Sequence, residues 1–340
     1  MAELVDAHDS KSCGAIHGSS ILPPGTKDSK VASPDLFMNP THQTKLLVVV
    51  GPTASGKSDL AVSLALAYNG EVISADSRQV YRGLNIGTGK ITVPEMKGVP
   101  HHCLDIADPA TRFTAMDWKK AAETAIADIT SRGKLPIICG GTGFYVSTLI
   151  NDLGFPDVPA DTAEQQALEE RSLEELFQEL KALDPARAAT IDLKNKRRLS
   201  RAIMIARAMG QVPPIQQPDK PRYDVLEIGT RWSDEKLRER IKARLESRLR
   251  DGLVAEVTKL AEAGLSYERM EELGLEYRYV SEHLQGRLAY IDMVALLEMR
   301  IWQYAKRQKT WFRRDPKIHW FTAPWPDETM NQLIATWLQQ

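Results

Sequence analysis

The chain has 340 residues, with 44 basic and 45 acidic side chains and a net charge of −1. A hydrophobic share of 43% with 26% charged residues excludes a mainly disordered chain, a collagen-like repeat and a disulfide scaffold. No window approaches the ~20 consecutive apolar residues of a membrane-spanning helix, so we expect no contact with a membrane. Three widely spaced cysteines favour a reducing compartment, and we expect a cytoplasmic monomer.

The first 44 residues are rich in Ser, Pro, Gly, Asp and Lys, and we predict a disordered leader over 1–44. Residues 45–157 then alternate short apolar runs with helical periodicity. The runs predict strands at 46–50, 71–75 and 135–139, and the periodicity predicts helices at 58–68 and about 116–131. Strands that alternate with helices indicate an α/β fold with a mostly parallel sheet.

The pattern changes between 158 and 221, where amphipathic helical segments replace strands and four prolines close the stretch. YDVLEIGT at 223–230 then predicts a further strand. We therefore expect an all-helical subdomain at 158–221, inserted into a core whose second part is 222–340. Leucine or isoleucine at every fourth position from Leu237 to Leu253 predicts one long helix, and the chain reads as helical from there to about Phe312.

The clearest chemical motif is GPTASGKS, which fits G-x-x-x-x-G-K-[ST] between a predicted strand and a predicted helix. Its glycines let backbone N–H groups converge on phosphate oxygens, Lys57 neutralises charge, and the Ser58 hydroxyl can ligate Mg²⁺. The motif thus predicts a P-loop core that binds a di- or triphosphate through Gly51, Pro52, Thr53, Ala54, Ser55, Gly56, Lys57 and Ser58.

The loop alone leaves the reaction open. A GTPase would need the guanine-reading NKxD, but Asn195-Lys196 is followed by two arginines. A small-molecule kinase or NTPase stays possible. Asp76 ends the second predicted strand, and ligands of open α/β sheets bind at that edge, so we expect Asp76 close to the phosphates.

Two basic clusters stand out in this near-neutral chain. One lies between Lys194 and Arg201, and the other between Lys306 and Arg314, interleaved with Trp311 and Phe312. Basic residues mixed with aromatic ones favour contact with RNA or nucleotides over a merely solvated face. For the pair His101-His102 and for Cys103 and Cys139 we expect structural roles, because no zinc-ligand spacing is present.

Taken together, the motifs resemble those of the tRNA dimethylallyltransferases, which prenylate an adenosine beside the anticodon. The matching segments run in the family's order from Leu46 to about Arg313: GPTASGKS, ISADSRQVYRGLNIGTGK, PHHCLDI, GGTGFY, NKRRLSRAI and YAKRQKTWFR. The resemblance implies a P-loop core with an inserted helical domain that holds the anticodon stem-loop.

The resemblance also implies roles for individual residues. Thr53–Ser58 would hold the diphosphate of dimethylallyl diphosphate with Mg²⁺, Asp76 would be the general base, and Thr142 would lie near the reacting groups. Contacts with tRNA would come from Asp76, Ser77, Arg78, Gln79, Thr142, Arg197, Arg198, Leu199, Ser200 and Arg201.

Two segments depart from the family's usual pattern: GLEYRYV at 274–280, in place of a GYKEL-like segment, and Ile301-Trp302, in place of Thr-Arg. Both fall in the C-terminal helices, and we expect them to leave the active site untouched. The implied function is dimethylallyl transfer to the exocyclic amine of the adenosine 3′ of the anticodon, with release of diphosphate. Prenylation of free adenine nucleotides is the nearer alternative, and a P-loop kinase or NTPase is the more distant one.

Overall fold

A six-stranded, fully parallel sheet forms the centre of the computed structural model, which describes residues 43–156, 158, 162–215, 218 and 220–340. The strand order is β3-β2-β4-β1-β5-β6, so β1 lies between β4 and β5. The strands are β1 (Thr44–Val50), β2 (Gly70–Ser74), β3 (His101–His102), β4 (Leu135–Gly140), β5 (Tyr223–Arg231) and β6 (His319–Thr322). β1 and β4 are buried along most of their length, which explains why they read as continuous apolar runs.

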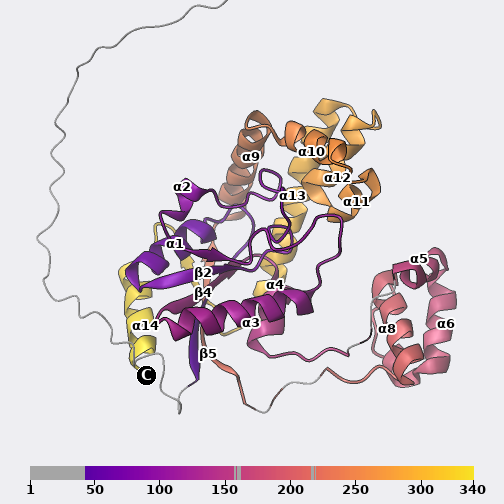
Figure 1. Ribbon diagram of the computed structural model, residues 1–340, viewed down its shortest axis with the longest axis horizontal. Helices are drawn as coiled ribbons and strands as arrows, with labels where there is room; N and C mark the ends of the chain where they lie inside the picture. The colour runs from indigo at the N-terminus through magenta and orange to yellow at the C-terminus, as the bar shows by residue number, and fades with distance from the viewer. Residues whose placement is uncertain (1–42, 157, 159–161, 216–217, 219) are drawn as a thin grey trace, which may run out of the picture. The chain divides into compact units, whose positions relative to one another are not determined.

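Helices cover both faces of this sheet (Figure 1). One face packs against α1 (Lys57–Ala67) and α14 (Glu328–Gln339). The opposite face shares a core with α3 (Ala115–Ser131), α4 (Gly143–Ile150), α9 (Asp234–Arg250), α10 (Leu253–Glu262), α11 (Tyr267–Leu273), α12 (Leu275–Leu284) and α13 (Tyr290–Phe312). The short helix α2 (Val93–Met96) follows β2.

Four helices lie between α4 and β5: α5 (Thr162–Glu170), α6 (Leu173–Leu183), α7 (Pro185–Ala188) and α8 (Lys196–Met209). Their buried residues form a hydrophobic cluster of their own, centred on Leu176, Leu180 and Ile203. The prediction of helices without strands in this segment therefore agrees with the residues that the structure describes.

The predicted strands and helices of the first part occur within one or two residues of their expected bounds. One expectation for the C-terminal part was wrong, and one strand was not predicted. The long helix is broken at Gly252, whose φ of 101° is left-handed, so that Leu253 begins α10. The edge strand β6, which pairs with β5, was not predicted, because HWFT is too short to carry a periodic signal.

The predicted leader, apart from its last two residues, lies outside the described part of the chain, and β1 begins at Thr44. Within the described residues, no helix combines the length and apolarity needed to cross a membrane.

Candidate active site

The loop Gly51–Ser58 joins the end of β1 to the start of α1, as its motif predicts. Gly56 has a left-handed φ of 87°, and a Cβ there would lie 2.9 Å from the ring of Trp325, so any other residue would be strained and crowded in this turn. Lys57 and Ser58 open α1, where the free N–H groups and the helix dipole attract an anion. The loop is therefore shaped to bind phosphate.

Arginines from α9 surround this loop, although they follow it by nearly two hundred residues. The Nε of Arg240 donates to the carbonyl of Ala54 at 2.7 Å, and Arg244 hydrogen-bonds the hydroxyl of Thr53. Burial lowers the pKa of Lys57 and also that of Arg244, although a guanidinium keeps its charge at neutral pH. Cationic groups gathered around one loop favour a strongly charged anion.

Asp76 follows β2 at the carboxyl edge of the sheet, next to the loop. Its Oδ1 accepts hydrogen bonds from the backbone N–H groups of Arg78, at 2.9 Å, and Gln79, at 3.4 Å. This turn fixes the carboxylate and leaves Oδ2 available to a ligand. The structure thus brings Asp76 and Lys57 into one cavity, as the sequence predicts.

Thr142 joins this group because β2 and β4 are neighbours in the sheet. Its hydroxyl accepts a hydrogen bond from the N–H of Ser77 at 3.0 Å, and its own N–H donates to the carbonyl of Ala75 at 3.1 Å. Thr142 is thus bonded to the two residues that flank Asp76, and its place near the reacting groups stays a prediction.

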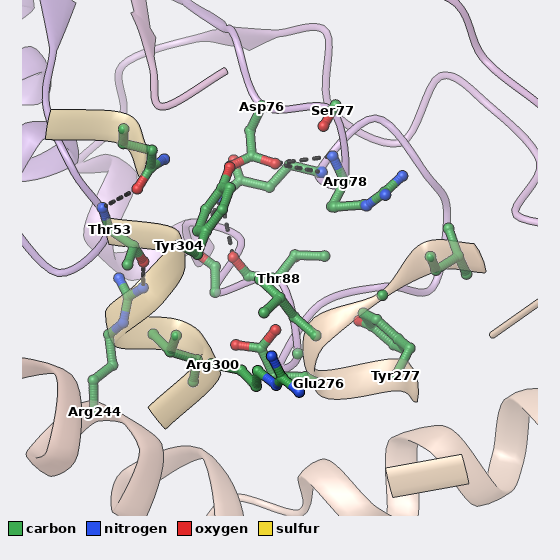
Figure 2. A pocket seen from close by; sticks show the side chains of 18 of the residues that line it. Thr53, Asp76, Ser77, Arg78, Thr88, Arg244, Glu276, Tyr277, Arg300 and Tyr304 are labelled. Carbon is green, nitrogen blue, oxygen red and sulfur yellow. Dashed lines mark hydrogen bonds between the residues drawn. The ribbon is translucent and has the colours of Figure 1, made fainter. Parts of the chain in front are cut away.

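Helix α13 closes one side of the cavity with Tyr304 and Gln308, neither of which was singled out from the sequence. Gln308 accepts from the N–H of Thr53 at 2.8 Å and donates to the carbonyl of Gly141 at 2.9 Å, so it ties the phosphate loop to the loop after β4. Figure 2 shows the ring of Tyr304 beside Asp76. Burial raises the pKa of the Tyr304 phenol, so the hydroxyl stays protonated at neutral pH.

Helix α12 closes another side, and here our expectation about the departing segments was wrong. Gly274–Tyr279 and Ile301 line the cavity of Asp76, instead of lying away from it. Glu276 forms a buried ion pair with Arg248 at 2.8 Å, and Arg248 also donates to the carbonyl of Gly87 at 3.1 Å. The packing of α12 against α13 brings both departures to the site.

Two cavities meet at the phosphate loop. The cavity of Asp76 has a volume of about 420 Å³, and a second one of about 680 Å³ lies against α9 and the residues around Thr92. Both fall in the size range of small-molecule sites. Both are lined by Lys57, Ser58, Gly89, Arg244 and Arg248. A ligand held by the phosphate loop can therefore extend into either space.

The predicted RNA contacts on α8 differ in exposure. Arg197 and Arg198 are exposed, whereas Leu199 and Ser200 are fully buried in the cluster of α5–α8. Arg201 donates to the carbonyl of Val158 at 2.6 Å. Burial is incompatible with a place on an RNA-binding surface, so the prediction is corrected for Leu199 and Ser200: helical periodicity turns them inward.

The histidines and cysteines occupy structural positions, as we expected. His102 hydrogen-bonds Glu71 at 2.8 Å, and His101 hydrogen-bonds the carbonyl of Val99 at 2.9 Å. Burial raises the pKa of Cys103 to about 12 and that of Cys139 to about 11. Both thiols therefore stay protonated and are poor nucleophiles, although Cys139 lines the cavity of Asp76.

Comparison with known proteins relates this geometry to a family. A family model described as IPP transferase matches residues 79–315. The tRNA dimethylallyltransferase 2 of Syntrophotalea carbinolica is 44% identical over 282 residues, covering 81% of this chain and 93% of that protein. The tRNA dimethylallyltransferase of Leuconostoc citreum is 40% identical over 297 residues, covering 87% and 99%.

Solved structures are similar as well. The full-length tRNA isopentenylpyrophosphate transferase from Bacillus halodurans gives a TM-score of 0.65 at 36% identity, covering 87% of this chain and 97% of that one. A eukaryotic dimethylallyltransferase, described as acting on tRNA, gives a TM-score of 0.72 at 27% identity, covering 86% of this chain and 78% of that one. These similarities and the parallel sheet confirm the expected α/β fold with a P-loop NTPase-like core.

Proposed function

Because this chain belongs to the IPP transferase family, we propose that it transfers a dimethylallyl group from dimethylallyl diphosphate to tRNA. The acceptor is the exocyclic amine of the adenosine 3′ of the anticodon, and diphosphate is released. Relatives named tRNA dimethylallyltransferases support the reaction. The observation that carries it in this chain is a phosphate-binding loop and an anchored carboxylate in one cavity.

The donor's diphosphate fits the loop Thr53–Ser58. The N–H groups at the start of α1 and the charges of Lys57 and Arg244 oppose the negative charge that grows on the bridging oxygen as the allylic C–O bond breaks. The N–H of Thr53 is already bonded to Gln308, which leaves the later residues of the loop for the phosphates.

Ser58 supports a place for Mg²⁺, because its side chain lines both cavities beside the loop. Within the described residues, no cluster of three or more His, Cys, Asp or Glu side chains could hold a metal by itself. This agrees with Mg²⁺, which usually relies on one or two protein ligands and on substrate phosphates. When bound, the ion would neutralise part of the diphosphate charge.

Asp76 is the group that fits the acceptor. An exocyclic amine is a weak nucleophile, since its lone pair is delocalised into the ring. Oδ2 of Asp76, which makes no hydrogen bond within the described chain, accepts the amine proton as the nitrogen attacks the allylic carbon. Thr142 bonds to Ser77, the residue after Asp76, and the ring of Tyr304 lies beside this carboxylate (Figure 2).

An adenine stacked in its loop cannot reach a cavity lined by Asp76, so the base must leave the stack, at a cost of a few kcal/mol. Contacts elsewhere on the RNA offset that cost. Exposed Arg197 and Arg198 on α8, with the cluster of Lys306, Arg307 and Arg314 at the end of α13, supply the positive charge for such contacts.

Incubation of the protein with labelled dimethylallyl diphosphate and unmodified tRNA tests the proposal. Label that appears on tRNA supports it. Label on free AMP or ATP instead would favour the nearer alternative, and hydrolysis of ATP without prenyl transfer would favour an NTPase.

We further infer a monomer in the cytosol. The buried free thiols of Cys103 and Cys139 support a reducing compartment.

A further inference from the structure

Glu227 is a buried carboxylate outside the cavity of Asp76. It lies on β5 opposite Val48 of β1, in the interior of the sheet, and only 6% of it is exposed. Among the residues that the structure describes, none forms a hydrogen bond or an ion pair with its side-chain carboxylate. Burial, with a smaller contribution from Asp315, raises the pKa of Glu227 to about 7.

An unpaired carboxylate in the interior is costly, and most buried polar groups have a partner. We expect a hydrophobic residue at this position of β5 to make the fold at least as stable. A titratable group kept at this position points to a ligand that is not part of this chain, since functional groups are often kept at the expense of stability.

A cavity of about 320 Å³ adjoins Glu227. It lies between α4, the end of α13 and the segment that leads to β6, and its polar or aromatic lining includes Ser147, Asn151, Trp311, Arg314 and Asp315. Trp311 is 39% exposed, and its ring packs so closely on Gly143 that a Cβ there would lie 2.2 Å from it. The indole is thus held at the cavity by the backbone of α4.

The lining favours a flat ligand with N–H donors over a metal ion. Asp315 is the other carboxylate of the cavity, and its Oδ1 already accepts the N–H of Lys317 at 2.9 Å. One free carboxylate beside an exposed indole is typical of sites that stack a nucleobase and bond its edge.

The cavity is also connected to the site of the reaction along one face of α13. Gln303 and Arg307 line the cavity of Asp76 and a shallow hollow beside it, and Trp311 and Arg314 line that hollow and the cavity of Glu227. At 1.5 Å per residue, Gln303 and Trp311 lie about 12 Å apart along α13, a distance that a short single strand of RNA can span. Basic side chains border the path throughout.

We propose that the cavity of Glu227 binds a second nucleobase of the anticodon loop, one that carries an exocyclic amino group. The base stacks on Trp311, and its amino group donates to the carboxylate of Glu227. This site rests on the proposed function, because it requires RNA whose target adenosine lies at Asp76.

The test compares Glu227→Leu, Glu227→Gln and the control Glu246→Gln, which changes an exposed carboxylate of α9 that lines none of these cavities. The probe is an anticodon stem-loop RNA with its target adenosine, bound without the prenyl donor. We expect Glu227→Leu to weaken binding by about tenfold or more, in keeping with the loss of a hydrogen bond to a base. Glu227→Gln keeps an acceptor oxygen, so its affinity for the RNA should fall less than that of Glu227→Leu. The control should bind as the wild type does.

A second series identifies the base. In one loop position at a time, hypoxanthine replaces adenine or uracil replaces cytosine, so that a carbonyl takes the place of the amino group. At one position, the base change should lower the affinity of the wild type for the RNA about tenfold and should not lower that of Glu227→Leu any further. Thermal unfolding should show Glu227→Leu at least as stable as the wild type, which separates lost recognition from misfolding.

The proposal is overturned if Glu227→Leu binds the stem-loop with normal affinity. It is also overturned if every base change lowers the affinity of the wild type and of the variant by the same factor. Stabilisation of the wild type, but not of Glu227→Leu, by Mg²⁺ or a polyamine alone would assign the cavity to a cation and also overturn it. Binding is measured without the donor, so a failure of the proposed prenyl transfer would appear separately, as intact RNA binding without product.

Discussion

Replacement of Asp76 by asparagine separates its two functions. In the structure, Oδ1 accepts the N–H groups of Arg78 and Gln79, whereas Oδ2 makes no hydrogen bond within the described chain. Asparagine can keep the first function through its carbonyl oxygen, but its amide cannot accept a proton as a carboxylate does. The variant should therefore fold normally and bind dimethylallyl diphosphate with nearly unchanged affinity.

The expected loss in rate follows from general-base catalysis, which contributes roughly 10²- to 10⁴-fold. At 1.36 kcal/mol for each factor of ten, this corresponds to about 3 to 5 kcal/mol of transition-state stabilisation. Single-turnover transfer to tRNA, with both substrates saturating, measures it directly. Asp76→Ala is the matched comparison, because it also removes the two hydrogen bonds of the turn, each worth about 1 kcal/mol of folding free energy.

A near-normal single-turnover rate for Asp76→Asn would remove Asp76 from the proton transfer. A loss that disappears at higher donor concentration would instead show that the carboxylate organises donor binding. Unfolding by urea should rank the alanine variant below both the wild type and the asparagine variant, as the turn predicts.

Three further outcomes are expected. Lys57→Ala should weaken donor binding and slow transfer while tRNA affinity is kept, since the lysine opposes charge on the diphosphate; a collapse of tRNA affinity with normal donor kinetics would contradict this. Replacement of exposed Arg197 and Arg198 by alanine should lower tRNA affinity and reduce the slope of log affinity against log salt by roughly 0.7–0.9 per lost phosphate contact. Equal slopes for the wild type and the variant would show that these arginines form a solvated face. Ion pairs with Arg132 and Lys134 hold the pKa of Glu71 well below its usual value of 4.5, so the contribution of Glu71 to stability is complete above about pH 5 and is lost on acidification. The variant Glu71→Gln should therefore show a smaller fall in melting temperature below pH 5 than the wild type. An unchanged profile would count against the ion pairs.

Local sequence determined the parts of this protein whose physical requirements are local. The apolar runs of β1 and β4 and the motif Gly51–Ser58 were assigned within a residue or two, because a buried strand and a phosphate-binding turn depend on neighbouring residues. Asp76 was placed correctly at the sheet edge, because the parallel sheet itself dictates where its strands end. The break at Gly252 and the edge strand β6 were not predicted, since a single glycine and a strand of four residues carry little periodic information.

The remaining walls of the cavity were decided by tertiary packing alone. Arg244 of α9 and Gln308 of α13 reach the loop from distant parts of the chain, and Glu276 of α12 reaches the cavity beside it. Their helical periodicity indicates only that one face is buried, not which residues meet across the core. For the same reason the departing segment Gly274–Tyr279 was expected to leave the active site untouched, although helix packing turns it into the cavity. Glu227 shows the same limit: within the sequence of β5 it is one polar residue in a strand, and only the folded sheet buries its carboxylate without a partner.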